Sequence, residues 1–195
     1  MSNVEPVHES EPRRVLDEFA SRVAPDFDWS PMELVQAEQV VEPFQRLLVH
    51  TNHMTTTLAG YHGDAVSLRV LRTRTDAEAY ARVIQLLSGP DEHVVEFGIM
   101  RFDLSLASPA VRDAVNHART PLGDILIQHD VMRVIEPRWF LSLAAGQPLL
   151  AQMGLPQDRR AFGRIGCIHC DGKPAIDLLE VVTDVRAMSH NGDAG

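Results

Sequence analysis

Pairs of largely apolar segments joined by tight turns constrain the fold of this chain most. In a strand, successive side chains point to opposite faces of the sheet, so the residues of each segment divide into two faces. Gly89-Pro90-Asp91 separates one pair, and Asp171-Gly172 separates another. Because such short turns join neighbouring strands, we expect two antiparallel hairpins. Their strands are predicted at residues 79–88 with 93–105, and at residues 162–170 with 173–183.

A further hairpin is expected between residues 54 and 72. Residues 54–61 (MTTTLAGY) are rich in β-branched side chains, which favour strands, and residues 65–72 (AVSLRVLR) alternate. His62-Gly63-Asp64 between them has the composition of a turn. Residues 131–143 are ambiguous and fit a strand with a loop at Pro137.

Helical signals lie before and between these hairpins. The apolar residues of segment 13–23 have helical spacing, and Ser30 before Pro31 is a typical helix start. Further helices are predicted over residues 43–51, from Ser108-Pro109 to about residue 117, and over residues 121–128. Hairpins interleaved with helices predict an α+β fold, in which helices flank an antiparallel sheet.

The negative charge of the chain is concentrated near its N-terminus. Residues 1–43 carry ten acidic and three basic side chains, whereas residues 44–195 carry seventeen and fifteen. We therefore predict an acidic N-terminal extension with short helices over residues 1–43, disordered at residues 1–12, and a globular domain over residues 44–190.

Composition argues against several classes of protein. The chain has no basic stripe for nucleic acid, and no apolar run approaches the roughly 18 residues that span a membrane. Its first residues lack the apolar segment of a signal peptide, so we expect a cytoplasmic protein. Cys167, His169 and Cys170 lack the four-ligand pattern of a structural zinc site, so no metal is predicted.

Two charged residues stand where the strand pattern would place apolar ones. Arg82 and Glu180 each share a strand face with three large apolar residues. An arginine there keeps its charge and needs an anion, which could be Glu180 or the carboxylate of a ligand. The alternatives are a snorkelling Arg82, and for Glu180 an edge position or a plain ion pair.

Weaker candidates for the same site are Glu96, Gly98 and Arg164. A glycine within a strand, such as Gly98, allows close approach of a backbone or a ligand, or marks a bulge. Glu96 shares its strand face. Arg164 is a further candidate contact for an anion, with a surface position as the alternative.

Five segments of the chain follow one another in a distinctive order: HMTTTLAGYHGDAVSLRVLR, YARVIQLL, EFGIMRFDLS, TPLGDIL and FGRIGCIHCDGKPAIDLLEVV. In this order they resemble the chorismate pyruvate-lyase family, most of all its actinobacterial and cyanobacterial branch. The resemblance runs from about residue 47 to residue 183. It implies an antiparallel sheet with an enclosed ligand cavity, and a carbon–oxygen lyase that cleaves chorismate to 4-hydroxybenzoate and pyruvate without metal or organic cofactor. The expected partner is therefore a small carboxylated substrate, not nucleic acid or a membrane.

The resemblance also implies a role for individual residues. The arginine that binds the ring carboxylate in the family falls on Arg82. The glutamate of its last strand falls on Glu180, which would serve as general acid or proton relay. The other substrate-binding positions are Met54, Gly98, Leu122 and, for the enolpyruvyl carboxylate, Arg164.

Two other functions fit the same residues. One is a noncatalytic domain that binds an aromatic acid, because this fold also forms the effector-sensing domain of a family of transcription regulators. Residues 1–46 are too short and too acidic for the winged helix-turn-helix of such a regulator. The other is an enzyme of the same fold acting on a different carboxylated substrate. His53, Glu96 and His129 would favour it if they lined the cavity.

Overall fold

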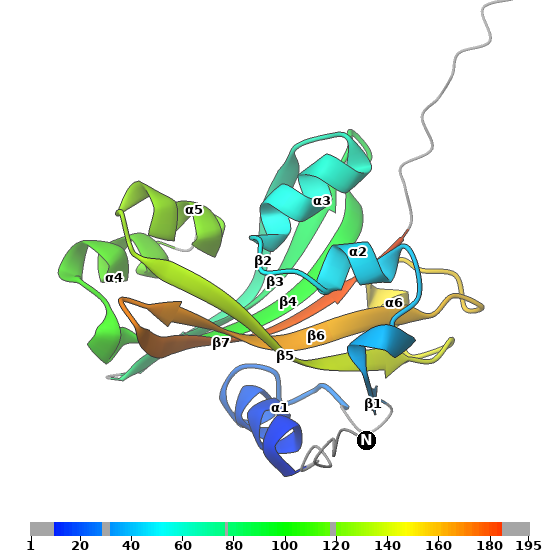
Figure 1. Cartoon of the computed structure of the whole chain (residues 1–195), viewed down its shortest axis with the longest axis horizontal. Coiled ribbons are helices and arrows are strands. Elements are labelled where there is room, and N and C mark those ends of the chain that lie inside the picture. The colour runs from blue at the N-terminus through cyan, green and yellow to red at the C-terminus, as the bar shows by residue number, and fades with distance from the viewer. Residues whose placement is uncertain (1–9, 29–31, 77, 118–119, 185–195) are drawn as a thin grey trace, which may run out of the picture.

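One antiparallel sheet of seven strands, in the order β1-β5-β6-β7-β4-β3-β2, forms the centre of the molecule (Figure 1). The computed structural model describes residues 10–28, 32–76, 78–117 and 120–184. Each pair of neighbouring strands is antiparallel, so the predicted fold class is confirmed. The strands are β1 (Met32–Val35), β2 (Val66–Thr75), β3 (Ala79–Ser88), β4 (His93–Asp103), β5 (Arg133–Leu143), β6 (Ala161–Cys170) and β7 (Lys173–Val182).

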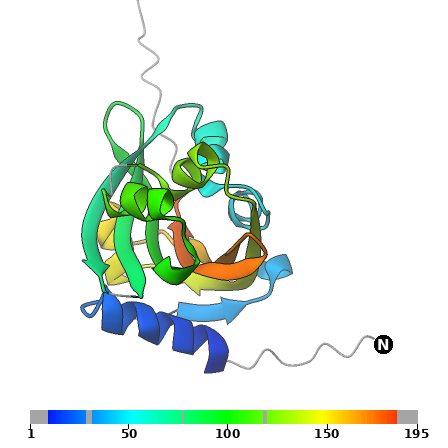
Figure 2. The same cartoon turned by 90° about the vertical axis from the view of Figure 1, so that its left-hand side faces the viewer.

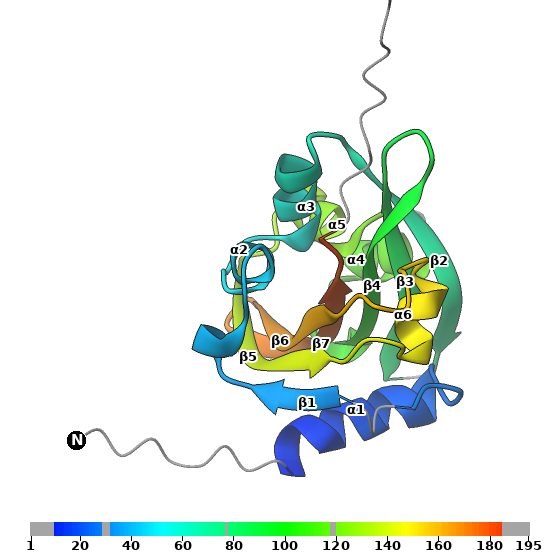
Figure 3. The same ribbon diagram turned by 90° about the vertical axis from the view of Figure 1, so that its right-hand side faces the viewer.

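Helices cover both faces of this sheet. Figures 2 and 3 show the sheet curving around one side, which we call the concave face, with α1 on the outer or convex face. Helices α2, α3, α4 and α5 lie over the concave face, whereas residues of α6 pack together with α1 on the convex one. The helices are α1 (Ser10–Arg22), α2 (Phe44–Leu48), α3 (Met54–His62), α4 (Pro109–Asn116), α5 (Leu122–Gln128) and α6 (Pro148–Gln152), with short 3-10 turns at Ala37–Gln39 and Leu104–Leu106.

The convex face carries a continuous apolar core. Alternate residues of the central strands, among them Val83, Phe97 and Val181, are almost fully buried there. From α1, Phe19 and Val23 pack against them, as the helical spacing of segment 13–23 predicts. This layer removes a large apolar area from water and is the main source of stability on this side of the sheet.

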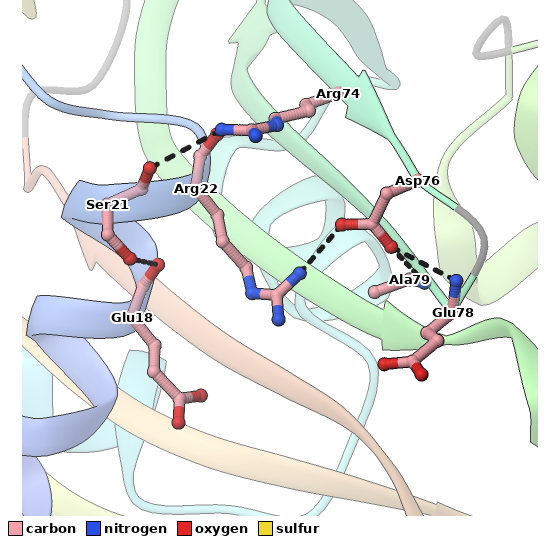
Figure 4. Close-up of polar contacts among 7 residues, drawn as sticks. All are labelled: Glu18, Ser21, Arg22, Arg74, Asp76, Glu78 and Ala79. Carbon is pink, nitrogen blue, oxygen red and sulfur yellow. Dashed lines mark hydrogen bonds and ion pairs between the residues drawn. The ribbon is translucent and has the colours of Figure 1, made fainter.

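Polar contacts tie the end of α1 to the loop between β2 and β3 (Figure 4). The Arg22 guanidinium lies 2.8 Å from the Asp76 carboxylate. Asp76 also accepts hydrogen bonds from the backbone N–H groups of Glu78 and Ala79. Arg74 donates to the carbonyl of Arg22, one of the carbonyls that a helix C-terminus leaves without an intrahelical partner. These contacts fix where α1 crosses the sheet.

The predicted strand at residues 54–61 is wrong, because this segment forms helix α3. Met54 and Leu58 are buried at helical spacing, and Thr57 donates its hydroxyl to the carbonyl of His53. Packing of this apolar stripe over the sheet outweighs the strand preference of the threonines. The predicted turn is instead the end of the helix, where Gly63 adopts the left-handed conformation with φ +76°.

Two expectations for the N-terminal region also differ from the structure. Ser30 and Pro31 lie outside the described residues, and no helix follows them, since residues 32–35 form β1 and pair with β5. This long-range pairing covers an otherwise free strand edge, which a local capping signal cannot reveal. Residues 1–9 of the segment predicted to be disordered lie outside the description, but residues 10–12 begin α1. The domain boundary at residue 43 stays a prediction.

The remaining elements follow the predictions closely. The ambiguous segment 131–143 forms β5, and its register shifts between Pro137 and Trp139. A proline has no backbone N–H to donate to the neighbouring strand, so a bulge at this point replaces the expected loop.

None of the helices within the described ranges is long and apolar enough to cross a membrane.

Candidate ligand-binding site

A cavity of about 80 Å³ lies on the concave face, between the sheet and the helices α3 and α5. A single water needs only about 10–15 Å³ of such space, so the cavity admits a small organic molecule. All six residues predicted for the site line it: Met54, Arg82, Gly98, Leu122, Arg164 and Glu180. His53 and Glu96 line it as well. His129 does not, and borders a separate pocket beside α4.

The sheet register explains why these residues meet. Ile84, Gly98, Glu180 and Arg164 lie opposite one another in a single row across β3, β4, β7 and β6. Arg82 belongs to the next row on the same face, and Glu96 to the row on the other side. Rows on one face are about 7 Å apart, so three rows place all the charged groups around one small volume.

Arg164 is the most completely buried charged side chain of the site, with 1% of its surface exposed. Its Nε donates to Oε2 of Glu180 at 2.6 Å. Its Nη1 donates to the backbone carbonyls of Leu48 and His50, at the C-terminal end of α2. Its Nη2 has no hydrogen-bond partner among the described residues. Arg164 therefore joins α2 to the sheet and leaves one donor unpaired beside the cavity.

Arg82 is also buried, but it has no ionic partner in the described part of the chain. Its Nη1 donates to the carbonyl of Thr120 at 3.2 Å, and its Nε has no hydrogen-bond partner among the residues that the structure describes. Burial lowers the pKa of this guanidinium, although arginine remains charged at neutral pH. Glu180 is thus not the anion that the sequence allowed for Arg82, since it pairs with Arg164.

Glu96 is a buried carboxyl with 3% of its surface exposed. Its Oε2 has no hydrogen-bond partner among the described residues. Its Oε1 lies only 2.9 Å from the point that a Cβ on Gly98 would occupy, so the side chain folds over this glycine. Burial, and next the charge of Glu180, raise the pKa of Glu96 well above its ordinary value.

His53 closes the cavity at the start of α3. Its Nε2 accepts a hydrogen bond from Nε of Arg133 at 2.7 Å. Its ring also packs on Gly123 of α5, where an added Cβ would lie 2.7 Å from Nδ1. Burial, and next the charge of Arg133, lower the pKa of His53. The neutral imidazole therefore bridges α3, α5 and β5 over the cavity.

The described residues contain no cluster of three or more His, Cys, Asp or Glu side chains placed to hold a metal ion. Cys167 and Cys170 are both buried free thiols. Burial raises the pKa of both, that of Cys170 to about 11, so each remains a neutral thiol.

Several polar contacts of the site carry no signal in the sequence. The carbonyls of Leu48, His50 and Thr120 hold the two arginines, and any residue type supplies such a carbonyl. Arg133, the partner of His53, lies in the segment whose structure was ambiguous. The signal that could have identified Arg133 as the partner of His53 is its position at the start of a strand that faces α3.

Comparisons with known proteins identify the fold. No protein-family model and no curated protein matches the sequence. PhnF from Mycobacterium smegmatis superposes with a TM-score of 0.52 at 11% identity, covering 74% of this chain and 72% of that chain. The ligand-binding domain of a protein from Bordetella bronchiseptica, assigned to the GntR family of transcriptional regulators, gives a TM-score of 0.47 at 12% identity, covering 62% of this chain and 87% of that domain.

The chain thus has the chorismate lyase-like fold, which it shares with PhnF from M. smegmatis. At these identities the likeness establishes the fold alone. It does not confirm the narrower resemblance to the chorismate pyruvate-lyase family.

Proposed function

We propose that this chain is a binding domain for a small carboxylic acid, held in the cavity on the concave face. The observation that carries the proposal is Arg82, a buried guanidinium that lines the cavity and has no ionic partner in the described residues. A buried charge without a counterion is costly, and a carboxylate offers a guanidinium two parallel hydrogen bonds. A carboxylate ligand at Arg82 would therefore be strongly favoured.

The walls of the cavity support a ligand with an apolar body. Ile84, Ile135 and Leu178 are among the large apolar side chains that surround the charged groups. A flat ring or short chain could pack between them while its carboxylate meets Arg82. The net charge of the site agrees with a monoanion, since Glu180 already pairs with Arg164 and burial favours a neutral Glu96.

The structural neighbours add support of a different kind. The B. bronchiseptica neighbour is named a ligand-binding domain of a GntR-family regulator, which agrees with binding rather than catalysis.

Calorimetric titration with benzoate and 4-hydroxybenzoate tests the proposal. We expect binding, and a loss of affinity of about 30-fold or more in Arg82→Met, because the carboxylate loses its buried partner. Arg69→Met is the matched control, since Arg69 is an exposed arginine paired with Glu92. Its affinity should equal that of the wild type. The proposal is wrong if neither acid binds, or if both variants bind as tightly as the wild type.

A second candidate is the pyruvate lyase acting on chorismate. It is favoured by the unpaired donors of Arg82 and Arg164, because chorismate carries two carboxylates. Incubation with chorismate, with and without EDTA, followed by chromatography of pyruvate and 4-hydroxybenzoate, separates the two functions. Equal amounts of both products above the spontaneous rate would support the lyase. Glu180→Gln should then lower turnover more than product affinity, as expected for a proton relay, because the pairing with Arg164 favours an ionised Glu180 that accepts a proton before passing it on.

A further inference from the structure

We infer that Glu96 contacts the ligand and donates a hydrogen bond from a neutral carboxyl group, so that the site selects carboxylic acids with an acceptor oxygen away from the carboxylate. The inference rests on the proposed function, since it concerns the same cavity. The proposed function assigns the carboxylate of the ligand to Arg82, and this inference assigns the acceptor oxygen of the ligand to Glu96.

The position of Glu96 is the first argument. Its side chain folds over Gly98, and Gly98 lies directly opposite Glu180 in the sheet. The Glu96 carboxyl therefore reaches from its own row into the middle row of the site. With 3% of its surface exposed and Oε2 unpartnered in the described residues, it lines the cavity with a free oxygen.

The charged groups around Glu96 are the second argument. The titratable or charged residues that share the cavity with it are Glu180 on β7, Arg164 on β6, Arg82 on β3 and His53 at the start of α3. Arg164 uses its hydrogen bonds for Glu180 and two backbone carbonyls, and Arg82 binds the carbonyl of Thr120. Within the described ranges neither arginine donates to Glu96, and Arg133 donates to His53.

A carboxylate at Glu96 would thus stand beside that of Glu180 in a buried site without a hydrogen-bonded cation of its own. Two carboxyls in such a position do not both ionise, and the one that lacks a salt bridge holds the proton. The direction of the pKa shift at Glu96 agrees with this arrangement. A neutral carboxyl has an O–H donor, and a buried donor requires an acceptor.

The spacing of the rows defines the ligand further. Arg82 lies one row, roughly 7 Å, from the row into which Glu96 folds. This separation suits an acid whose carboxylate and acceptor oxygen stand at opposite ends of a ring. The acceptor can be a hydroxyl, a carbonyl or an ether oxygen, because each accepts from a carboxyl O–H.

Titration calorimetry with two probes, benzoate and 4-formylbenzoate, tests the inference from pH 5 to pH 9. The formyl group accepts hydrogen bonds and cannot donate them. We expect Glu96→Met to lower the affinity for 4-formylbenzoate at least tenfold and the affinity for benzoate less than threefold. Glu96→Gln keeps a donor, so it should bind both probes and lose the pH dependence of the wild type. In the wild type, 4-formylbenzoate should bind tenfold more weakly per pH unit once Glu96 ionises.

The outcomes separate this inference from the proposed function. If benzoate binds and Arg82→Met abolishes its binding, while Glu96→Met weakens both probes equally, the inference fails and the proposed function stands. If neither probe binds the wild type, both fail. The conservative variant Glu33→Gln, an exposed strand carboxylate, should leave affinity and pH dependence unchanged.

A measurement without ligand guards against a folding defect in the variants. The infrared difference spectrum of wild type minus Glu96→Gln at pH 7 should contain the carbonyl band of a protonated carboxyl. If the difference spectrum contains carboxylate bands instead, and no band of a protonated carboxyl, the inference is overturned.

Discussion

The two faces of the sheet use neighbouring residues of the same strands in opposite ways. On the convex face, Val83, Phe97 and Val181 belong to an apolar core that α1 and α6 cover. On the concave face, the adjacent positions Arg82, Glu96 and Glu180 are also buried, but they surround a cavity. The members of the two sets are direct neighbours in the sequence, and strand alternation alone sends their side chains to opposite faces.

The difference shows in how polar groups are satisfied. Gln85, a buried polar residue on the convex side, donates to the carbonyl of Gln152, and on this side of the described residues Nε of Arg101 is the exception without a partner. At the cavity, Nε of Arg82, Oε2 of Glu96 and Nη2 of Arg164 have no partner within the described residues. Unpaired buried polar atoms lower stability, and they are retained where a ligand can satisfy them. The convex face therefore stabilises the sheet, and the concave face offers polar groups to a ligand.

The largest effect is expected from Phe97→Ala on the convex face. Phe97 is fully buried, and its ring centroid lies 4.8 Å from that of Phe27. Loss of the ring should reduce the free energy of unfolding by about 4 kcal/mol, measured by urea denaturation. Below the transition, the affinity for 4-hydroxybenzoate should stay within about twofold of the wild type. A large loss of affinity in the folded variant would mean that the faces are coupled.

The next effect concerns the ion pair of the concave face. Arg164→Met leaves Glu180 buried without its cation and removes a donor from the carbonyls of Leu48 and His50, of which that of Leu48 still accepts from the His50 N–H. We expect a loss of about 3 kcal/mol in the free energy of unfolding. The double variant Arg164→Met, Glu180→Leu should recover most of this stability, since it removes the stranded charge as well. If the double variant is no more stable than the single one, the carbonyl contacts of Arg164 matter more than the ion pair.

The sequence predicts the hairpins well because their information is local. Turn residues and the largely apolar segments beside them place β3, β4, β6 and β7 within a few residues of their observed ends. The sequence also identifies Arg82 and Glu180 as candidate site residues, because a charged residue on an apolar strand face is unusual whatever its neighbours. The pairing of Glu180 with Arg164 rather than Arg82 depends on the order β6-β7-β4-β3, which no local pattern contains.

The mistaken strand at residues 54–61 has a similar cause. Three threonines favour extended backbone, whereas the burial of Met54 and Leu58 over the concave face decides for the helix. That burial is a tertiary effect. It matters for the site, because the same helix start carries His53 and Met54 to the cavity.

A moderate effect should distinguish two glycines, one on each face. A Cβ on Gly163, on the convex side, would lie 2.9 Å from the backbone carbonyl oxygen of Glu180, which cannot move aside. Gly163→Ala should therefore cost about 2 kcal/mol of unfolding free energy. A Cβ on Gly98 would meet the flexible end of Glu96 at the same distance, and Cδ1 and Cγ1 of Ile84 at 3.1 Å, but no backbone atom. Gly98→Ala should change stability by less than about 1 kcal/mol, but reduce ligand affinity about tenfold by pushing Glu96 into the cavity.

Denaturation and calorimetry on both glycine variants check this contrast. Equal losses of stability would contradict it, because they would mean that Glu96 is as immovable as backbone. Unchanged affinity in Gly98→Ala would place the Glu96 carboxyl away from the ligand.

The smallest effect is a slope with pH, and it arises from Glu96. The pKa of this carboxyl is raised above its ordinary value near 4.5, so the folded state binds more protons than the unfolded one above that pH. Stability should therefore fall as pH rises from about 4.5 toward the folded-state pKa, by at most about 1.4 kcal/mol per pH unit. Glu96→Gln has no such group and should become progressively more stable than the wild type over this range.

His50 and His53 act in the opposite direction. Their pKa values are lowered, mainly by burial, so each reduces stability as pH falls through the range below 6.5. Both histidines are present in the wild type and in Glu96→Gln, and their effect cancels in the difference between the two melting curves. The difference in melting temperature between the wild type and Glu96→Gln, followed from pH 5 to pH 9, therefore isolates the effect of Glu96. A constant difference would mean that this carboxyl is ionised in the folded protein, and that the concave face tolerates two buried carboxylates beside a single salt bridge.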